Sequence, residues 1–154
     1  MGGLVSVTGS LHVVGTLTAG VKSFEINHPL DPDNKFLRHA CIESDEIVNI
    51  YSGNITTDED GYAIVQLPKW MNALNKDFKY QLTILGKIFA QAIIYEEINK
   101  EGKFRIQTSI PDTRVSWQVT GVRHDDFVIK NPLVVEEDKN RVMETNKSLK
   151  EKTE

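Results

Sequence analysis

Residues Arg114–Arg123 read RVSWQVTGVR. In this stretch apolar Val115, Trp117 and Val119 alternate with polar Ser116, Gln118 and Thr120. Successive side chains of a strand point to opposite faces, so this period of two predicts a strand with one face toward a core. The neighbouring segments extend the same pattern toward the N-terminus.

Several further strands and turns precede this stretch. DFKYQLTIL, IFAQAIIYEEI and, across an NKEG turn, KFRIQTS are strand-like. Earlier, IVNIYSGNIT predicts a strand with both faces partly buried. TDEDG then predicts a hairpin turn in which Gly61 takes a positive φ, with YAIVQL as the return strand.

One short helix interrupts these strands. In LPKWMNALNKD, Trp70, Ala73 and Leu74 fall at i, i+3 and i+4 behind a proline, which predicts a helix over about residues 69–76. FEINHPLDPDNKFLRHA has two prolines and no clean period, so we expect an ordered loop there rather than a helix. With about seven strands and one helix, the chain is expected to be mainly β.

The composition indicates one domain with appendages. The chain has 154 residues, of which 40% are hydrophobic and 26% charged. A net charge of -4 argues against nucleic acid as the main partner. Cys41 has no second cysteine to pair with, and no apolar run is long enough to enter a membrane as a helix. The N-terminus lacks a signal-peptide pattern, so we expect a fragment of a longer protein or a component delivered by a non-classical route.

The first residues raise the question of a partner. Leu4–Gly20 reads LVSVTGSLHVVGTLTAG, and Gly3, Gly9 and Gly15 recur every six residues. This pattern predicts a long extended stem over residues 1–22. Its apolar row consists of Val5, Val7, Leu11, Val13 and Leu17.

Two partners for this stem remain open. It could add as an edge strand to the chain's own β domain, but strands usually run to only five or six residues. Alternatively, identical stems of several chains wrap around a common axis, with the apolar row as the seam between chains. The sequence favours the second interpretation. It predicts an assembly of several identical chains with a short intertwined β stem, similar to a β-helix, followed by a β-rich, sandwich-like head.

A family resemblance indicates how many chains associate. KSFEINHPLDPDNKFLRHACIES, NIYSGN, VQLPKWMNALNKDFKYQLTILG and VSWQVTGVR resemble a C-terminal module of phage tail-fibre-like and large bacterial surface proteins. In that module a GxLxVxGxL stem precedes a segment of the form KSFxIDHPLDPxNKYLxH. The resemblance spans about residues 4–125, and the chain departs from it at Asn27, where aspartate is commoner.

The resemblance implies a homotrimeric, non-enzymatic fibre element, and we expect no catalytic residues, metal or cofactor. It suggests a virion-associated or extracellular location and upstream fibre segments as partners, while charge and hydropathy argue against nucleic acid and membrane insertion. The boundaries expected from the sequence are a stem over residues 1–22, a head over 23–130 and a polar tail over 131–154. The tail is charged and poor in core-forming residues, so we expect disorder or a solvated helix.

Some residues could be interpreted as chemical sites. His28, Asp31 and Asp33 could form a hydrolytic or metal site, but such residues beside proline more commonly bond their own backbone in turns. Asp58 and Asp60 faintly resemble a calcium loop that lacks its other ligands. Three copies of His12 could bind a transition metal in a trimer. The alternation places His12 on the face opposite the seam, which favours a solvated side chain.

Carboxylates and aromatic residues give two alternative functions. Pairs such as Glu43 with Glu46, or Glu96 with Glu97, could be glycosidase residues, although nothing in the sequence sets their separation. The aromatic residues could form a sugar-stacking platform, which makes a receptor- or glycan-binding head the main alternative to a structural fibre segment. Most of them fall on apolar faces and are therefore expected in the core. They are Phe24, Phe36, Tyr51, Trp70, Phe78, Tyr80, Tyr95 and Trp117.

Overall fold

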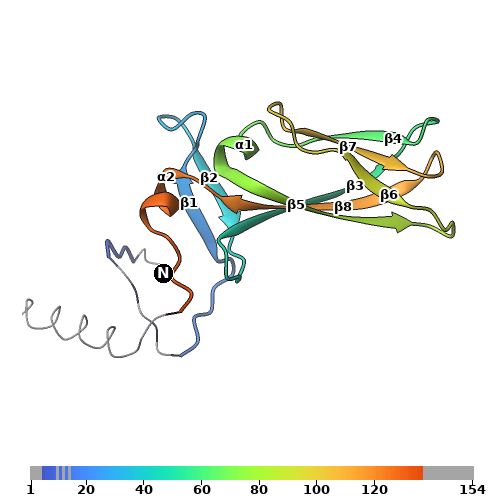
Figure 1. Cartoon of the computed structure of the whole chain (residues 1–154). Coiled ribbons are helices and arrows are strands. Elements are labelled where there is room, and N and C mark those ends of the chain that lie inside the picture. Colours follow the sequence, from blue (N-terminus) through green and yellow to red (C-terminus); the bar gives the residue numbers. More distant parts are fainter. Residues whose placement is uncertain (1–4, 10, 12, 14, 137–154) are drawn as a thin grey trace, which may run out of the picture.

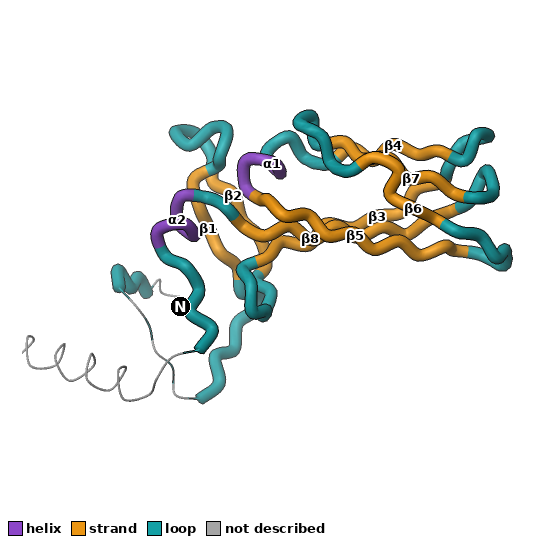
Figure 2. Tube along the Cα trace, viewed as in Figure 1, coloured by secondary structure: helices purple, strands orange, loops and turns teal. Residues whose placement is uncertain are grey.

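The chain is mainly β (Figures 1 and 2). The structure is a computed structural model, and it describes residues 5–9, 11, 13 and 15–136. The elements in chain order are β1 (Ser23–Asn27), β2 (Phe36–Ala40), β3 (Val48–Thr56), β4 (Tyr62–Gln66), α1 (Met71–Leu74), β5 (Asn75–Leu85), β6 (Ala92–Glu96), β7 (Lys103–Thr108), β8 (Arg114–Arg123) and α2 (Asp126–Lys130).

The strands form three antiparallel sheets. β1 pairs with β2, β8 lies between β3 and β5, and β7 lies between β4 and β6. The stretch RVSWQVTGVR is thus the central strand of its sheet, and Val115 and Val119 on it are fully buried. The period of two in the sequence is confirmed here, because one face of this strand is directed into the core.

The core contains side chains from both three-stranded sheets. Val65, Phe104 and Ile106 of one sheet form a buried cluster with Val115 and Val119 of the other. In Figure 1 the sheet β4-β7-β6 accordingly lies over the sheet β3-β8-β5. Burial of apolar area at about 25 cal/mol per Å² is the main term that holds such layers together.

The predicted hairpin around Gly61 is confirmed as a turn but not as a pair of strands. Gly61 has φ +80, and an added Cβ there would lie 2.8 Å from the carbonyl oxygen of Thr108. However, β3 pairs with β8, and β4 pairs with β7. The turn therefore carries the chain from one sheet to the other, since each strand buries its apolar face better in its own layer. The NKEG turn, by contrast, joins two paired strands, β6 and β7.

The expected burial of IVNIYSGNIT on both faces is also corrected. β3 alternates along its length: Asn49 is buried, whereas Ile50, Ser52 and Asn54 are exposed. The reason is that only one face of this sheet is covered by the other layer.

The helix expected over about residues 69–76 is shorter than predicted. It ends at Leu74 because Asn75 has φ -131 and ψ 157 and already begins β5. Met71 and Leu74 are fully buried, so the helix serves to place two apolar side chains in the core.

The segment expected to be a loop contains β1 and β2. Its two prolines lie in the turn between these strands, where neither needs to donate to the ladder. The two strands, SFEIN and FLRHA, contain several polar or charged residues and lack a clear alternation of apolar side chains. α2 was likewise missed by the sequence reading, although Asp125 is a good N-cap and accepts hydrogen bonds from the backbone N–H groups of Phe127 and Val128.

The described stem residues before Ser23 are exposed, and none of them is in a strand. They are therefore not an edge strand of the head. Of the predicted tail, residues 131–136 are exposed and irregular, and the rest lies outside the described residues. None of the described helices has the length and apolar character required to span a membrane.

Candidate functional site

The two three-stranded sheets have two distinct ends. The residues at one end of β3, β8 and β5, namely Thr56, Arg114 and Leu85, share one rung of the ladder. The loops 57–61, 86–91 and 109–113 lie beyond this rung, away from β1, β2 and the stem (Figure 1). We call this the distal end.

Three buried threonines connect the loops of the distal end. The hydroxyls of Thr57 and Thr108 are 2.9 Å apart, and the backbone N–H of Thr113 donates to Thr57 Oγ1 at 3.0 Å. Thr113 Oγ1 and Thr108 Oγ1 both donate to the carbonyl of Ile110, at 2.7 and 2.8 Å. Because these polar groups are buried and satisfied by one another, the distal loops have a defined shape.

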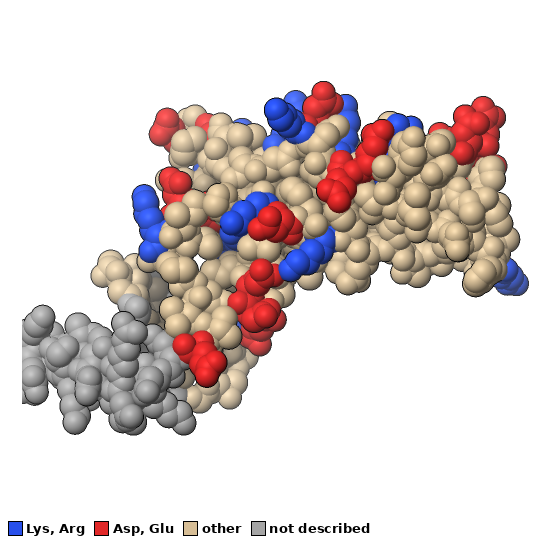
Figure 3. Space-filling view, viewed as in Figure 1, with Lys and Arg blue, Asp and Glu red and all other residues tan. Residues whose placement is uncertain are grey.

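The β5–β6 loop presents an unusually exposed aromatic side chain. Phe89 is 98% exposed, and Ile88 beside it is 48% exposed. The loop is anchored behind them, because Gln91 N–H donates to Ser109 Oγ at 2.9 Å and Ser109 N–H donates to the carbonyl of Gln91. Figure 3 shows a basic group at the tip of this loop and acidic groups gathered over the β3–β4 turn at the same end.

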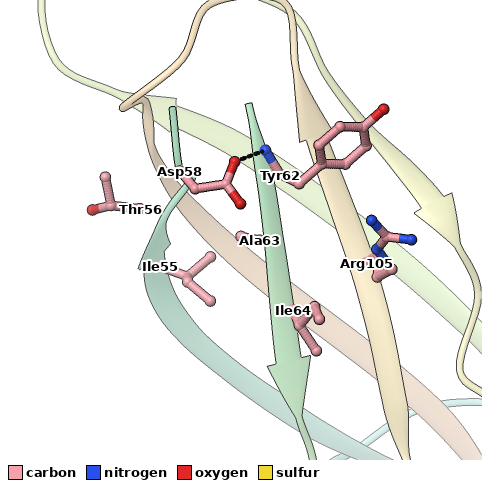
Figure 4. A pocket seen from close by; sticks show the side chains of 7 residues that line it. All are labelled: Ile55, Thr56, Asp58, Tyr62, Ala63, Ile64 and Arg105. Atoms are coloured by element: carbon pink, nitrogen blue, oxygen red, sulfur yellow. Dashed lines mark hydrogen bonds between the residues drawn. The ribbon is translucent and has the colours of Figure 1, made fainter. Parts of the chain in front are cut away.

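A cavity of about 320 Å³ opens on the other side of the distal end (Figure 4). Its lining residues come from β3, the following turn, β4 and β7, and they are Ile55, Thr56, Asp58, Tyr62, Ala63, Ile64 and Arg105. Asp58 is committed to the turn, since its Oδ1 accepts hydrogen bonds from the N–H groups of Tyr62, at 2.8 Å, and Asp60, at 3.1 Å. The lining is thus mixed, with apolar Ile55, Ala63 and Ile64 beside polar side chains that include the cation Arg105.

Arg105 is held between two tyrosines on the outward face of the sheet β4-β7-β6. Its guanidinium carbon lies 5.1 Å from the ring centroid of Tyr62 and 5.2 Å from that of Tyr95. Its Nη1 also contacts Glu96 Oε1 at 2.9 Å. Cation–π contact and the ion pair together fix this side chain, and its charge is already balanced.

A second cluster connects β1 and β2 to the sheets. His39 stacks on Phe24, and its Nε2 lies 3.2 Å from the hydroxyl of Tyr51. The guanidinium carbon of Arg123 lies over the ring of Phe24, 3.9 Å from its centroid. Arg123 also forms an ion pair with Asp125 at 2.8 Å. Burial, and secondarily the charge of Arg123, lower the pKa of His39 below its ordinary value. This cluster is therefore a joint between the β1–β2 hairpin and the sheets that favours a neutral imidazole.

A wider cleft of about 630 Å³ lies beside this joint, between the β1–β2 hairpin and α2. Apolar Phe36 and Phe127 border it together with polar His28 and Asp126. Further titratable side chains in its lining are Glu25, His124 and Asp125.

The residues predicted for the seam are all exposed: Val5, Val7, Leu11, Val13 and Leu17. Their apolar side chains are in contact with solvent in the single chain. His12, which was considered as a metal ligand, lies outside the described residues. The prediction of an inter-chain seam stays a prediction.

The predicted turn role of HPLDP is confirmed. Asp31 Oδ1 accepts from the Asn34 amide at 2.8 Å, and Leu30 N–H donates to His28 Nδ1 at 3.2 Å. Hydrogen bonds from Asn34 and then Lys35 lower the pKa of Asp31. Among the described residues, no three His, Cys, Asp or Glu side chains are grouped so that they could hold a metal ion.

The glutamates considered as glycosidase pairs are engaged elsewhere. Glu43 pairs with Lys22 at 2.9 Å, and Glu46 pairs with Lys79 at 2.7 Å. Glu96 pairs with Arg105, as described above. Glu43, Glu46 and Glu96 thus each have their own cation on a different element, and Glu97 is exposed. This arrangement does not resemble two carboxylates facing one bond.

The aromatic residues lie in different surroundings. Five of them pack against the core cluster, as the sequence predicted: Tyr51, Trp70, Phe78, Tyr80 and Trp117. Phe24 lies instead in the joint with His39 and Arg123. Phe36 and Tyr95 are instead exposed, and so is Phe89, which the sequence reading did not single out. Phe89 follows Lys87 and Ile88 in a short loop, and no local pattern distinguishes an exposed aromatic residue there from a buried one.

Comparisons of the chain with protein-family models, with curated proteins and with solved structures found no match.

Proposed function

We propose that this chain is a structural segment of an elongated fibre, in which three copies associate through their stems and heads. The observation that carries the proposal is the stem itself. Its alternating apolar side chains are exposed in the single chain, and its described residues lie in none of the chain's sheets. An apolar row of this kind gains about 25 cal/mol per Å² when a neighbouring chain covers it.

In this proposal the head determines the number of chains and their register. Its two packed sheets form a sandwich-like unit, and association of three heads raises the local concentration of the three stems. Alignment by the heads also prevents slips of the stems, which a period-two pattern alone would permit. Upstream fibre segments would continue the stem, in a virion or at a cell surface.

The mass of the intact chain in solution tests the proposal. Light scattering coupled to size exclusion should give three times the mass of one chain, which is 17.4 kDa. Dilution to micromolar concentration should leave this mass unchanged. A particle with the mass of one chain under these conditions would overturn the proposal.

A second candidate function is a receptor- or glycan-binding head. It is favoured by one observation, namely that Tyr62 and Tyr95 flank Arg105 on an outward sheet face. Aromatic rings of this kind stack on sugars, and three copies would add avidity. A glycan array probed with the wild-type chain and with Tyr95→Ala tests it. Binding that is lost in Tyr95→Ala supports this function, and absence of binding by the wild-type chain contradicts it.

A further inference from the structure

The head has two different flanks at its distal end. The edge strands β3 and β4 lie on one flank, because β3 ends the sheet β3-β8-β5 and β4 ends the sheet β4-β7-β6 on the side where these two strands contact each other. β5 and β6 lie on the opposite flank and contact each other there. The cavity lies on the β3–β4 flank, and the loop that carries Phe89 lies on the β5–β6 flank.

The two features are at the same height along the sheets. Thr56, which lines the cavity, and Leu85, which precedes the β5–β6 loop, both pair with Arg114. A projecting aromatic side chain and an apolar cavity therefore occupy opposite flanks at one level. Because both features lie at one level, contact between one copy and the next requires no shift along the strands, and the angle between the two surfaces determines whether the copies close into a ring.

The cavity suits a phenyl ring in size and in chemistry. A cavity of ~150 Å³ is large enough to bind benzene, and this cavity measures about 320 Å³. Ile55, Ala63 and Ile64 provide apolar walls, and the guanidinium of Arg105 lies at its border. The ring of Phe89 would gain burial against these apolar side chains.

The charges around the two features are complementary. Lys87 lies two residues before Phe89 in the loop, and the turn beside the cavity contains Asp58, Glu59 and Asp60. In Figure 3 the basic group and the acidic groups stand at separate corners of the distal end. Docking of the loop of one copy at the turn of another would bring these opposite charges together.

We propose that Phe89 of one copy inserts into the cavity lined by Ile55, Ala63, Ile64 and Arg105 of the next copy, and that this contact repeats around a ring. The contact is heterologous, since each copy contributes the side chain on one flank and the cavity on the other. Heterologous contacts form closed rings when the rotation closes. The inference rests on the proposed trimer and names the contact by which its heads associate.

The contact also explains how the stems would be aligned. A rotation about an axis along the strands leaves all copies pointing in one direction, so the stems lie at one end of the ring. Heads joined in this way would hold the stems parallel and in the same register.

Replacement of Phe89 is the first test, with the full chain. Phe89→Ala should raise the concentration at which the trimer dissociates by about tenfold or more in sedimentation velocity. Phe127→Ala is the matched control, because Phe127 is 61% exposed but belongs to α2, far from the distal end. This control should behave as the wild type does. A stable trimer in Phe89→Ala that dissociates no more readily than the control overturns the proposal.

A cross-link tests the contact directly and does not depend on stability. In a Cys41→Ser background, Phe89→Cys combined with Ile64→Cys should give covalent dimers and trimers on oxidation. Each cysteine alone should give far less, because like positions do not meet in a heterologous contact. A trimer that yields no covalent product from the combined variant, or equal product from one single variant, contradicts the proposal.

The mass of the wild-type chain distinguishes failure of the proposed fibre function from failure of the Phe89 contact. If the wild-type chain has the mass of one chain, the proposed fibre function and this contact both fall. If the wild-type chain is a trimer and the variants at Phe89 and Ile64 leave it unchanged, only the contact falls.

Discussion

The indole of Trp117 lies against the backbone of Gly53 on the neighbouring strand. The two residues are partners in the ladder between β3 and β8, and a Cβ added to Gly53 would lie 2.7 Å from Cζ2 of Trp117. Trp117 also packs edge-on against Phe104, at 5.6 Å between centroids. Because Phe104 belongs to the other sheet, the missing side chain of Gly53 makes room for a contact between the layers.

Gly53→Val should therefore destabilise the head by about 1–3 kcal/mol, because an added side chain forces the indole out of its place. Chemical denaturation followed by circular dichroism measures this change. Ser52→Val is the matched control, since Ser52 precedes Gly53 but points outward. Equal midpoints for the two variants would contradict the account of this contact.

Thr57→Val should loosen the distal end. The substitution removes the hydroxyl that contacts Thr108 and accepts from the N–H of Thr113, and it leaves that buried N–H without its side-chain acceptor. The expected cost is about 1–3 kcal/mol. Hydrogen exchange should become faster in the loops 57–61 and 109–113. Thr83→Val, at an exposed position of β5, is the control. If this control accelerates exchange in the same two loops to the same degree, the threonine cluster has no specific role in them.

Acidification should weaken the joint around His39. Burial lowers the pKa of His39 in the folded chain, with a smaller contribution from the charge of Arg123. The unfolded chain then binds the extra proton more readily, so stability is complete above the ordinary histidine pKa of 6.5 and falls as the pH drops through and below it. The melting temperature should decrease between about pH 8 and pH 5.

His39→Gln should reduce this pH dependence, because it removes the titrating group from the joint. His124→Gln, at an exposed position, serves as the control and should retain the slope of the wild type. The interpretation of His39 is wrong if the two variants lose stability equally on acidification.

The stem should tolerate charge on one face only. Leu11 and Val13 are predicted to face the seam, and His12 between them is predicted to face solvent. Replacing both Leu11 and Val13 by Asp would place like charges at one height in every chain and should dissociate the trimer. His12→Asp should have a small effect. Oligomer mass and thermal melting compare the variants, and dissociation by His12→Asp alone would place the opposite face inside.

Removal of the residues beyond Asn140 should change the stability little. Their Lys, Glu, Asn and Thr side chains offer little apolar area to bury. Truncation at this point should leave the melting temperature and the oligomer mass nearly unchanged. A marked fall in either quantity would show that the tail packs against the assembly.

Local patterns predicted most strands of the head, and missed features have identifiable causes. The alternation of β8 was sufficient to predict it, and Gly61 was sufficient to predict its turn. β1 and β2 were missed because the two prolines between them made the whole segment resemble a loop. α2 was missed because it has only five residues, too few to show the helical spacing of apolar residues that would identify Asp125 as an N-cap.

The candidate contact site could not be predicted from the sequence. No sequence pattern distinguishes Phe89 from an aromatic residue that packs in the core. The tertiary structure shows that it lies in an anchored loop with its side chain exposed to solvent. Similarly, Ile64 and Arg105 are far apart in the sequence and become neighbours because β4 pairs with β7.

The sequence by itself therefore determined where the chain is extended, where it turns and which side of each strand is apolar, because these properties depend on residues close together along the backbone. Only the tertiary structure decided that β3 and β4 leave one turn for different sheets, and that Phe89 and Ile64 lie on opposite flanks at one height. Strand partners are chosen by burial and by hydrogen bonds between residues far apart in the chain, and no local pattern contains that choice.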